Sequence, residues 1–294
     1  MVVALGGLDN LVGVSHECDT PRDVIGLPRL SEPKFDPVGT SREIEDRVKA
    51  VLEEALGVYR IDGERLKELK PDVIVTQSHC QVCGVSEADL MVAVEQWLDY
   101  RPDVVTLVPT DLEGVWSDIR KIAKALGREE EGEALVRGMT DRMQAIARKA
   151  GAGNQNPRVA FIEWIDPLMA GGNWMPELVN MAGGINLIST AGDKSPWTSF
   201  DELEEADPDL IFIAPCGFEL DACERDLRAI SENSRWQGLR AVREGKVTYA
   251  DGHHYFNRPG PGLLTSLEIL AEIFHPDVFP PDNYGKWKSW DPGT

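Results

Sequence analysis

The chain has 294 residues, with 50 Asp and Glu against 30 Lys and Arg, and a formal net charge of −20 at pH 7. It shows no Lys/Arg cluster of the kind that phosphate backbones and anionic lipids attract, so neither a nucleic acid nor an anionic membrane is the expected partner. Hydrophobic residues make up 42% of the chain, enough for a substantial core. No apolar run approaches the roughly 20 residues of a membrane-spanning helix.

The cysteine count and the first residues bear on the compartment in which the protein is located. Five cysteines, an odd number, do not suggest a disulfide framework. The opening stretch MVVALGGLDN has no basic segment and no small-residue cleavage site, so a signal peptide is not predicted. Taken alone, that start would place the chain in the cytoplasm.

Short apolar runs alternate with helical patterns along the chain, which predicts an α/β fold. Strands are predicted at 11–14, 73–75, 104–108, 158–162, 210–213 and 246–249. Helices are predicted at 41–56, 64–70, 86–98, 112–126 and 129–149, and in a final segment that begins near 263. Ser41 is expected to cap the first of these helices, and Ser86 with Asp89 forms a capping-box pattern.

A unit of the first half recurs in the second. The segments ERLKELKPDVIV (64–75) and FDELEEADPDLIFI (200–213) both read as a short helix, then Pro-Asp, then a strand. The simplest architecture has two doubly wound α/β lobes joined by a long helix, with a ligand cleft between them. We expect an N-terminal lobe at 1–111, a connecting helical segment at 112–150 and a C-terminal lobe at 151–294.

Unusual side chains follow the predicted strands directly. In open parallel sheets, ligands bind outside the carboxyl ends of the strands, so these residues are predicted to face the cleft. Four of the five histidines and four of the five cysteines lie in such positions. The strand-end residues singled out are His16, Glu17, Cys18, His79, Cys80, Cys83, Glu163, Trp164, Cys216, Phe218, His253, His254 and Tyr255.

The residues alone leave two interpretations of this set open. In one, soft ligands close on a metal or on a metal-bearing molecule, and the candidate ligands are His16, His79, Cys80, Cys83 and His253. In the other, each side chain is an ordinary hydrogen-bonded or packed loop residue. Cys80 and Cys83 lack the second pair that a structural zinc site requires, and redox chemistry at this Cys-x-x-Cys is the less favoured alternative.

Aromatic residues gather in the loops of the second half. A cleft lined by aromatic rings with a few polar groups suits a large, flat ligand, although each ring could equally belong to the core. The candidates are Trp164, Trp174, Trp197, Phe218 and Tyr255, with Arg258 as a polar contact. The chain has no nucleophile elbow, phosphate-binding glycine loop or HExxH motif, so no enzymatic activity is predicted.

The order of motifs resembles a known family. The run LVGVS followed by Asp19 and Pro21, then LKPDVIV, a long helical region, ADPDLIFIAP and RPGP are similar to the helical-backbone substrate-binding proteins of ABC importers. These proteins are the binding components of importers for vitamin B12, iron–siderophores and haem. The variants SHECD, EWIDPLMAGGNWMPELV, PCGF and FNRPGP resemble most closely the cobalamin-binding branch.

The resemblance implies a fold, a ligand and a partner. It implies two α/β lobes with a corrinoid between them, a monomer, and an extracytoplasmic location. It also implies that Glu64 of one lobe and Asp201 of the other, with Glu202 beside it, dock on the permease. Glu17, Met169 and Trp197 match positions that contact the corrin in such proteins. Relatives begin with a strand that this chain lacks, so a missing first strand is expected.

Two alternatives to a corrinoid binder remain open at this point. The same fold could hold haem, an iron–siderophore or a transition metal through the His and Cys set. A cytoplasmic tetrapyrrole chelatase-like enzyme could use His253 and Glu17 on its substrate.

Overall fold

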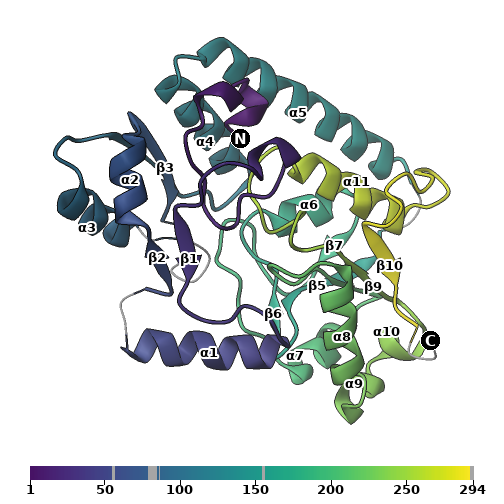
Figure 1. Ribbon diagram of the computed structural model, residues 1–294. Helices are drawn as coiled ribbons and strands as arrows, with labels where there is room; N and C mark the ends of the chain where they lie inside the picture. Colours follow the sequence, from purple (N-terminus) through teal and green to yellow (C-terminus); the bar gives the residue numbers. More distant parts are fainter. Residues whose placement is uncertain (55–56, 79–84, 86, 154–155, 292–294) are drawn as a thin grey trace. The chain divides into compact units, whose positions relative to one another are not determined.

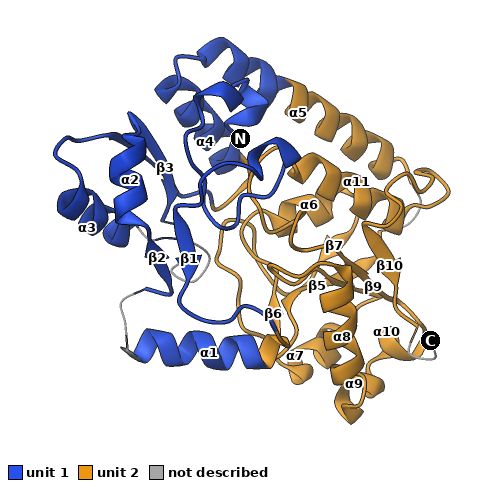
Figure 2. Ribbon diagram, viewed as in Figure 1, with its two compact units in different colours: residues 1–38, 43–109, 113–137 blue, residues 39–42, 110–112, 138–294 orange. Residues whose placement is uncertain are grey.

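The computed structural model describes residues 1–54, 57–78, 85, 87–153 and 156–291. These residues form two compact units (Figure 2): unit 1 comprises residues 1–38, 43–109 and 113–137, and unit 2 comprises residues 39–42, 110–112 and 138–294. The division falls inside a long helix, between Arg137 and Gly138, whereas the sequence suggested a separate connecting segment at 112–150. The predicted lobe limits stay a prediction.

Unit 1 holds two small sheets and the helices around them (Figure 1). Strands β1 (Ser31–Pro33) and β2 (Tyr59–Ile61) pair antiparallel, and β3 (Val73–Gln77) and β4 (Asp103–Leu107) pair parallel. The helices that begin or lie in this part of the chain are α1 (Ser41–Glu54), α2 (Gly63–Leu69), α3 (Glu87–Trp97), α4 (Leu112–Ala125) and α5 (Glu129–Gly151). Short 3-10 turns lie at Val3–Leu5, Leu8–Asn10 and Arg22–Val24. Leu66, Leu90 and Val94 form a buried cluster against the β3–β4 pair.

The strand predicted at 11–14 is wrong. Residues Leu8–Asn10 form a 3-10 turn, and only Val14 makes a β-bridge, to Arg29. The Val14 N–H donates to the Pro28 carbonyl and Val14 accepts from Leu30. Pro28 has no N–H to extend this pairing, so a regular ladder does not develop. The other five predicted strands and the predicted helices are confirmed to within a few residues, with 55–56 and Ser86 outside the described residues.

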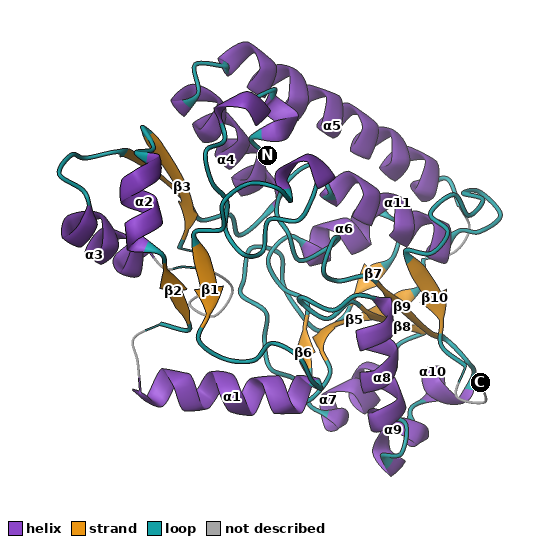
Figure 3. Ribbon diagram, in the orientation of Figure 1, coloured by secondary structure: helices purple, strands orange, loops and turns teal. Residues whose placement is uncertain are grey.

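A mixed sheet forms the centre of unit 2 (Figure 3). Its strand order is β10-β9-β8-β5-β6, with β7 also pairing with β5. The strands are β5 (Arg158–Trp164), β6 (Met169–Ala170), β7 (Ile185–Asn186), β8 (Leu210–Ile213), β9 (Val247–Ala250) and β10 (Trp287–Ser289). The pairs β7–β5, β5–β8 and β8–β9 are parallel, so their carboxyl ends share one edge.

Helices cover both faces of this sheet. They are α6 (Met175–Met181), α7 (Phe200–Ala206), α8 (Leu220–Ile230), α9 (Ser234–Gly238), α10 (Arg240–Arg243) and α11 (Leu263–Phe274). Figure 1 shows α6 and α11 on one side of the sheet and α8 and α10 on the other. Burial on both faces explains why β8 is apolar at all four positions, Leu210–Ile213, without polar alternation. The α/β fold predicted from the sequence is confirmed.

The internal repeat is confirmed down to the helix ends. Helix α2 ends at Lys70 and α7 ends at Asp207, and both residues adopt a left-handed conformation, with φ of 46° and 40°. In each case the N–H of that residue bonds to the carbonyl four residues earlier, of Leu66 or Leu203. Pro71 and Pro208 then stop the helix and begin the path to the strand. Glu64 and Asp201 therefore occupy equivalent places in the first turns of α2 and α7.

At the start of two helices, a backbone N–H donates to a carboxylate of unit 2. At the start of α1, the Ser41 N–H donates to both oxygens of Asp226, at 3.1 and 3.0 Å. At the start of α4, the Leu112 N–H donates to Glu177 at 2.8 Å. The sequence predicted that Ser41 itself caps α1, but its Oγ accepts from the Asp166 N–H instead, and Asp226 supplies the negative charge that a helix N-terminus favours. Burial raises the pKa of both Asp226 and Glu177.

Replacement of Asp226 tests the anchor of α1. Ser41 is fully buried and Asp226 is 3% exposed, so Asp226→Ala leaves a buried N–H without its acceptor. We expect the free energy of unfolding to fall by about 2 kcal/mol in Asp226→Ala and by about 1 kcal/mol in Asp226→Asn, which keeps one acceptor oxygen. Urea denaturation followed by circular dichroism measures both. Asp221→Ala, an exposed change in the same helix, should lower the free energy of unfolding by only a few tenths of the loss expected for Asp226→Ala. Equal losses in the two variants would refute the role of Asp226 as the anchor of α1.

Candidate functional site

In unit 1, the loop that contains His16, Glu17 and Cys18 is held by Ser31. The Ser31 Oγ accepts the His16 backbone N–H at 3.2 Å and lies 2.8 Å from His16 Nδ1. A hydroxyl has one hydrogen and two lone pairs, so Ser31 Oγ can donate to Nδ1 or accept from it, according to the tautomer of the ring. Nε2 lies 3.4 Å from Glu17 Oε1. Burial lowers the pKa of His16, which favours the neutral form of the ring.

Glu17 and Cys18 are the exposed residues of this loop, and His16 is not. The His16 ring stacks against Tyr59 with centroids 4.8 Å apart, and its side chain is 17% exposed against 47% for Glu17. Cys18 is exposed, and its carbonyl accepts from Arg29, which also donates to the Ser15 carbonyl at 2.7 Å. His79, Cys80 and Cys83, the other predicted site residues of this half, lie outside the described residues.

In unit 2, two loops at the carboxyl edge of the sheet are joined to each other. The N–H groups of Gly252 and His253 donate to the Phe218 carbonyl at 2.9 and 3.1 Å. The Asn257 side chain donates to the carbonyls of Ala214, at 2.9 Å, and Gly252, at 3.0 Å. A Cβ at position 252 would lie 2.1 Å from the Pro215 oxygen, so only glycine fits there. The loops after β8 and β9 thus form one continuous platform.

The predicted aromatic residues divide into core and loop positions. Trp174 is 3% exposed and its indole N–H donates to the Phe256 carbonyl at 2.7 Å, which gives it a packing role. Trp164, at the end of β5, packs against Phe218 with ring centroids 5.3 Å apart and the ring planes inclined by 58°. Trp197 is 56% exposed and pairs through its backbone with Met169. Contacts of these residues with a ligand stay predictions.

The polar side chains of the platform are paired. Arg258 donates to the His253 ring, with Nη2 2.9 Å from Nε2. His254 Nδ1 lies 2.8 Å from Asp251 Oδ2. Tyr255 is half-buried, with the Lys286 ammonium 5.5 Å from its ring centroid, and burial raises the pKa of its hydroxyl. The sequence placed His254 among the strand-end residues but did not single out Asp251, although the Asp-x-x-His spacing at the end of β9 was the available signal.

Glu163 is a further site residue that the sequence did not single out for a role. It lies at the end of β5, and its half-buried carboxyl accepts hydrogen bonds from the Ser195 hydroxyl and the Gly172 N–H. Burial outweighs these hydrogen bonds and raises its pKa to about 7. A carboxyl with this pKa changes charge near neutral pH, at the same sheet edge as Trp164.

The residues predicted to dock on a permease lie in the first turns of α2 and α7. Glu64 is exposed. Asp201 is 81% exposed and forms an ion pair with Arg235, which also contacts Glu204 at 3.3 Å. Glu202 accepts from the hydroxyls of Thr198 and Ser199 at 3.1 and 3.0 Å, so it belongs to the N-terminal cap of α7.

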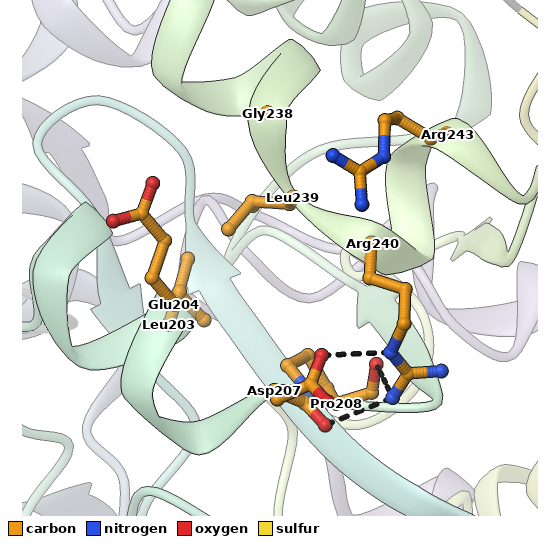
Figure 4. Close-up of a pocket in the computed structure, with 8 residues that line it drawn as sticks. All are labelled: Leu203, Glu204, Asp207, Pro208, Gly238, Leu239, Arg240 and Arg243. Carbon is orange, nitrogen blue, oxygen red and sulfur yellow. Dashed lines mark hydrogen bonds and ion pairs between the residues drawn. The ribbon is translucent and has the colours of Figure 1, made fainter.

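A small pocket of about 170 Å³ lies near the beginning of β8 (Figure 4). It is lined by Leu203, Glu204, Asp207, Pro208, Gly238, Leu239, Arg240 and Arg243. The Arg240 guanidinium is occupied by Asp207 at 2.7 Å and Asp209 at 3.0 Å. The pocket is at the amino end of β8, whereas the platform follows its carboxyl end, so it is not part of the candidate ligand site.

Residues 1–253 match the model of a protein family described as periplasmic binding protein. The chain belongs to this family. It falls among the helical-backbone substrate-binding proteins of ABC importers, as the order of its motifs suggested. Members are extracytoplasmic binding proteins, and the chelatase-like enzyme gains no support from the match. Among the described residues, no helix combines the length and the apolar character that crossing a bilayer demands.

Individual relatives within and around the family differ in what they bind. The chain is 26% identical over 250 residues to the uncharacterized ABC transporter substrate-binding lipoprotein YvrC of Bacillus subtilis, which covers 82% of this chain and 73% of that protein. It is 22% identical to a vitamin B12-binding protein of Vibrio cholerae, over 91% of this chain and 82% of the relative. A periplasmic heme-binding protein of Pseudomonas aeruginosa has the same fold, with a TM-score of 0.69 at 23% identity, covering 96% and 90% of the two chains.

Glu163→Gln tests the titration at the end of β5. A carboxyl whose folded-state pKa is raised stabilises the fold below its unfolded pKa, and that contribution is lost as the pH rises through the folded value, here from about 4.5 to about 7. The amide has no charge to desolvate. We therefore expect Glu163→Gln to gain stability relative to the unaltered protein, on the order of 2 kcal/mol, between about pH 4.5 and pH 8.

Urea denaturation at both pH values measures this difference. Glu205→Gln, an exposed change on α7, serves as the control and should follow the pH dependence of the unaltered protein. Parallel stability curves for Glu163→Gln and the unaltered protein would contradict the raised pKa.

Proposed function

We propose that this protein is the substrate-binding protein of an ABC-type importer and that its ligand is a corrinoid. The binding role comes from the family. The ligand is inferred from the strand-end loops: unit 2 supplies the aromatic pair Trp164 and Phe218, and unit 1 supplies the exposed carboxylate of Glu17. Rings of this kind pack against the flat face of a macrocycle, and a carboxylate accepts hydrogen bonds from neutral amides.

Charge supports a corrinoid over haem. The periphery of cobalamin carries carboxamides, which donate hydrogen bonds, whereas haem carries two carboxylates. A chain with net charge −20 and an exposed Glu17 repels anionic groups. Arg258, the cation of the platform, already donates to His253. The sequence similarity to vitamin B12-binding proteins of Vibrio points the same way.

Haem is the second candidate, and an iron–siderophore or a transition metal would fit the same family. Haem is favoured by one finding: the heme-binding structure from Pseudomonas aeruginosa superposes with a TM-score of 0.69, against 0.61 for the vitamin B12-binding protein of Vibrio cholerae. At these identities the likeness concerns the fold, so the ligand has to be decided by chemistry.

Titration calorimetry with cyanocobalamin and with haem decides between the two. We expect saturable one-to-one binding of cyanocobalamin and weaker binding of haem. Glu17→Gln removes one negative charge near the ligand and should strengthen haem binding by about fivefold, the effect of a like charge at about 4 Å in a largely solvated site. Glu32→Gln, an exposed change on β1, is the control and should alter neither ligand. Absence of heat with cyanocobalamin would refute the corrinoid assignment.

We propose further that Glu64 and Asp201 dock on arginines of the permease. Their equivalent places in the repeated helices, both exposed, support this. Asp201 differs in that Arg235 already pairs with it, so a permease arginine would compete with Arg235. Glu202, held in the helix cap, is the weaker candidate.

Transporter ATPase activity in proteoliposomes, stimulated by the binding protein, tests the docking residues. We expect Glu64→Gln and Asp201→Asn each to lower the stimulation several-fold, because each removes a charge-assisted hydrogen bond. Arg235→Gln should raise it by exposing Asp201. Glu68→Gln, exposed on the same helix as Glu64, should have no effect. Unchanged stimulation by the Glu64 and Asp201 variants would exclude these sites.

A further inference from the structure

A lysine lies at the carboxyl edge of the unit 2 sheet, beside the loop that follows β9. Strand β10 pairs antiparallel with β9, so the residue that precedes β10 lies next to the residue that follows β9. The Asp251 N–H accordingly donates to the Lys286 carbonyl at 2.9 Å. The Lys286 ammonium is 5.5 Å from the centroid of the Tyr255 ring, over its face. Lys286 thus brings a positive charge next to a predicted ligand-binding residue.

The half-buried Lys286 side chain is held by a buried amide. Its ammonium donates to Asn283 Oδ1 at 2.6 Å, and Asn283 Nδ2 donates to Glu272 Oε1. An ammonium can only donate and a carboxylate can only accept, so the orientation of the Asn283 amide is fixed from both sides. Asn283 is 6% exposed and Glu272 is 5% exposed, so neither has room to turn away.

A tight turn sets the direction in which Lys286 leaves the backbone. The Lys286 N–H donates to the Asn283 carbonyl at 3.1 Å, across a four-residue turn whose third residue, Gly285, has a φ of 76°. Glycine adopts this left-handed conformation without the steric penalty of other residues. Glu272 also accepts from the Trp287 indole N–H at 3.2 Å, so both ends of the turn are fixed to α11.

Among the described residues, Asn283 is the only hydrogen-bond acceptor of the Lys286 ammonium. An ammonium carries three hydrogens, so two are left for another acceptor. We propose that Lys286 binds an anionic oxygen of the ligand and that, in a corrinoid, this oxygen belongs to the phosphodiester of the nucleotide loop. That group has one negative charge, whereas the amides of the cobalamin periphery are neutral, so it is the group that a fixed ammonium favours. This inference rests on the proposed function, since it names the part of the corrinoid that Lys286 recognises.

Titration calorimetry with cyanocobalamin and with dicyanocobinamide tests the proposal. The second corrinoid lacks the phosphodiester and ends in a neutral hydroxyl. We expect the unaltered protein to bind cyanocobalamin about tenfold more tightly or better, as one charge-assisted hydrogen bond provides. High ionic strength should reduce this preference, because salt screens the attraction between a partly exposed ammonium and an anion.

Three variants assign the preference to the lysine. Lys286→Gln should lower the affinity for cyanocobalamin about tenfold and leave that for dicyanocobinamide within about twofold, which also shows that the variant is folded. Lys286→Arg keeps the positive charge and should retain most of the cyanocobalamin affinity. Lys288→Gln, the matched control, removes the same charge two residues further along, where the ammonium pairs with Glu224, and should alter neither affinity.

The outcomes separate this inference from the proposed function. Equal affinities of the unaltered protein for the two corrinoids, or equal losses for both in Lys286→Gln, would overturn the role of Lys286 while corrinoid binding stands. Weaker binding of haem by Lys286→Gln, with cyanocobalamin binding unchanged, would assign the ammonium to a carboxylate and overturn the phosphodiester contact. Failure of the unaltered protein to bind either corrinoid would overturn the proposed function and this inference together.

Discussion

The platform of unit 2 depends on the backbone conformation of Phe256. This residue has a φ of 61°, a left-handed conformation that costs a residue with a side chain roughly 1 kcal/mol or more. Its surroundings leave no alternative. The ring is fully buried against Phe161 and Phe212, the N–H donates to Ser266 Oγ at 2.9 Å, and the carbonyl accepts from Trp174. Because Phe256 is fixed, the residues just before it, His253 to Tyr255, are presented at the edge of the sheet, and Asn257 after it can join the neighbouring loop.

Acidic residues in this chain serve three different purposes, which net charge alone conceals. Most are exposed and give the surface its negative character. Asp226 and Glu177 are at helix starts, where the N-terminal dipole offsets part of the cost of burying a carboxylate. Glu272 is 5% exposed and accepts from the backbone of Asp282 and the side chains of Asn283 and Trp287, which ties β10 and its turn to α11. Some of the acidic residues of this fold therefore stabilise it through buried hydrogen bonds and do not serve surface charge.

Much of the fold could be predicted from the sequence because it depends on local patterns. The repeated helix–Pro–Asp–strand unit predicted two equivalent turns, and both have the same helix end at Lys70 and Asp207. The strand at 11–14 could not be excluded, since its failure depends on Pro28, a residue distant in sequence that lacks the required N–H. Trp174 and Trp197 read alike in sequence, and only the packing of Phe256 shows that one belongs to the core.

The chemistry of the histidines was harder to predict, because it depends on which nitrogen carries the hydrogen. The sequence could place His253 and His254 after β9, but it could not identify the partners of the histidines, which are Ser31 for His16, Arg258 for His253 and Asp251 for His254. Ser31 is fifteen residues from His16 and belongs to β1. The two adjacent histidines have partners of opposite charge: the Arg258 guanidinium contacts His253, and the Asp251 carboxylate contacts His254. A donor partner occupies the lone pair of an imidazole nitrogen and an acceptor partner holds its hydrogen, so the number of histidines at a sheet edge does not give the number of ligands available there.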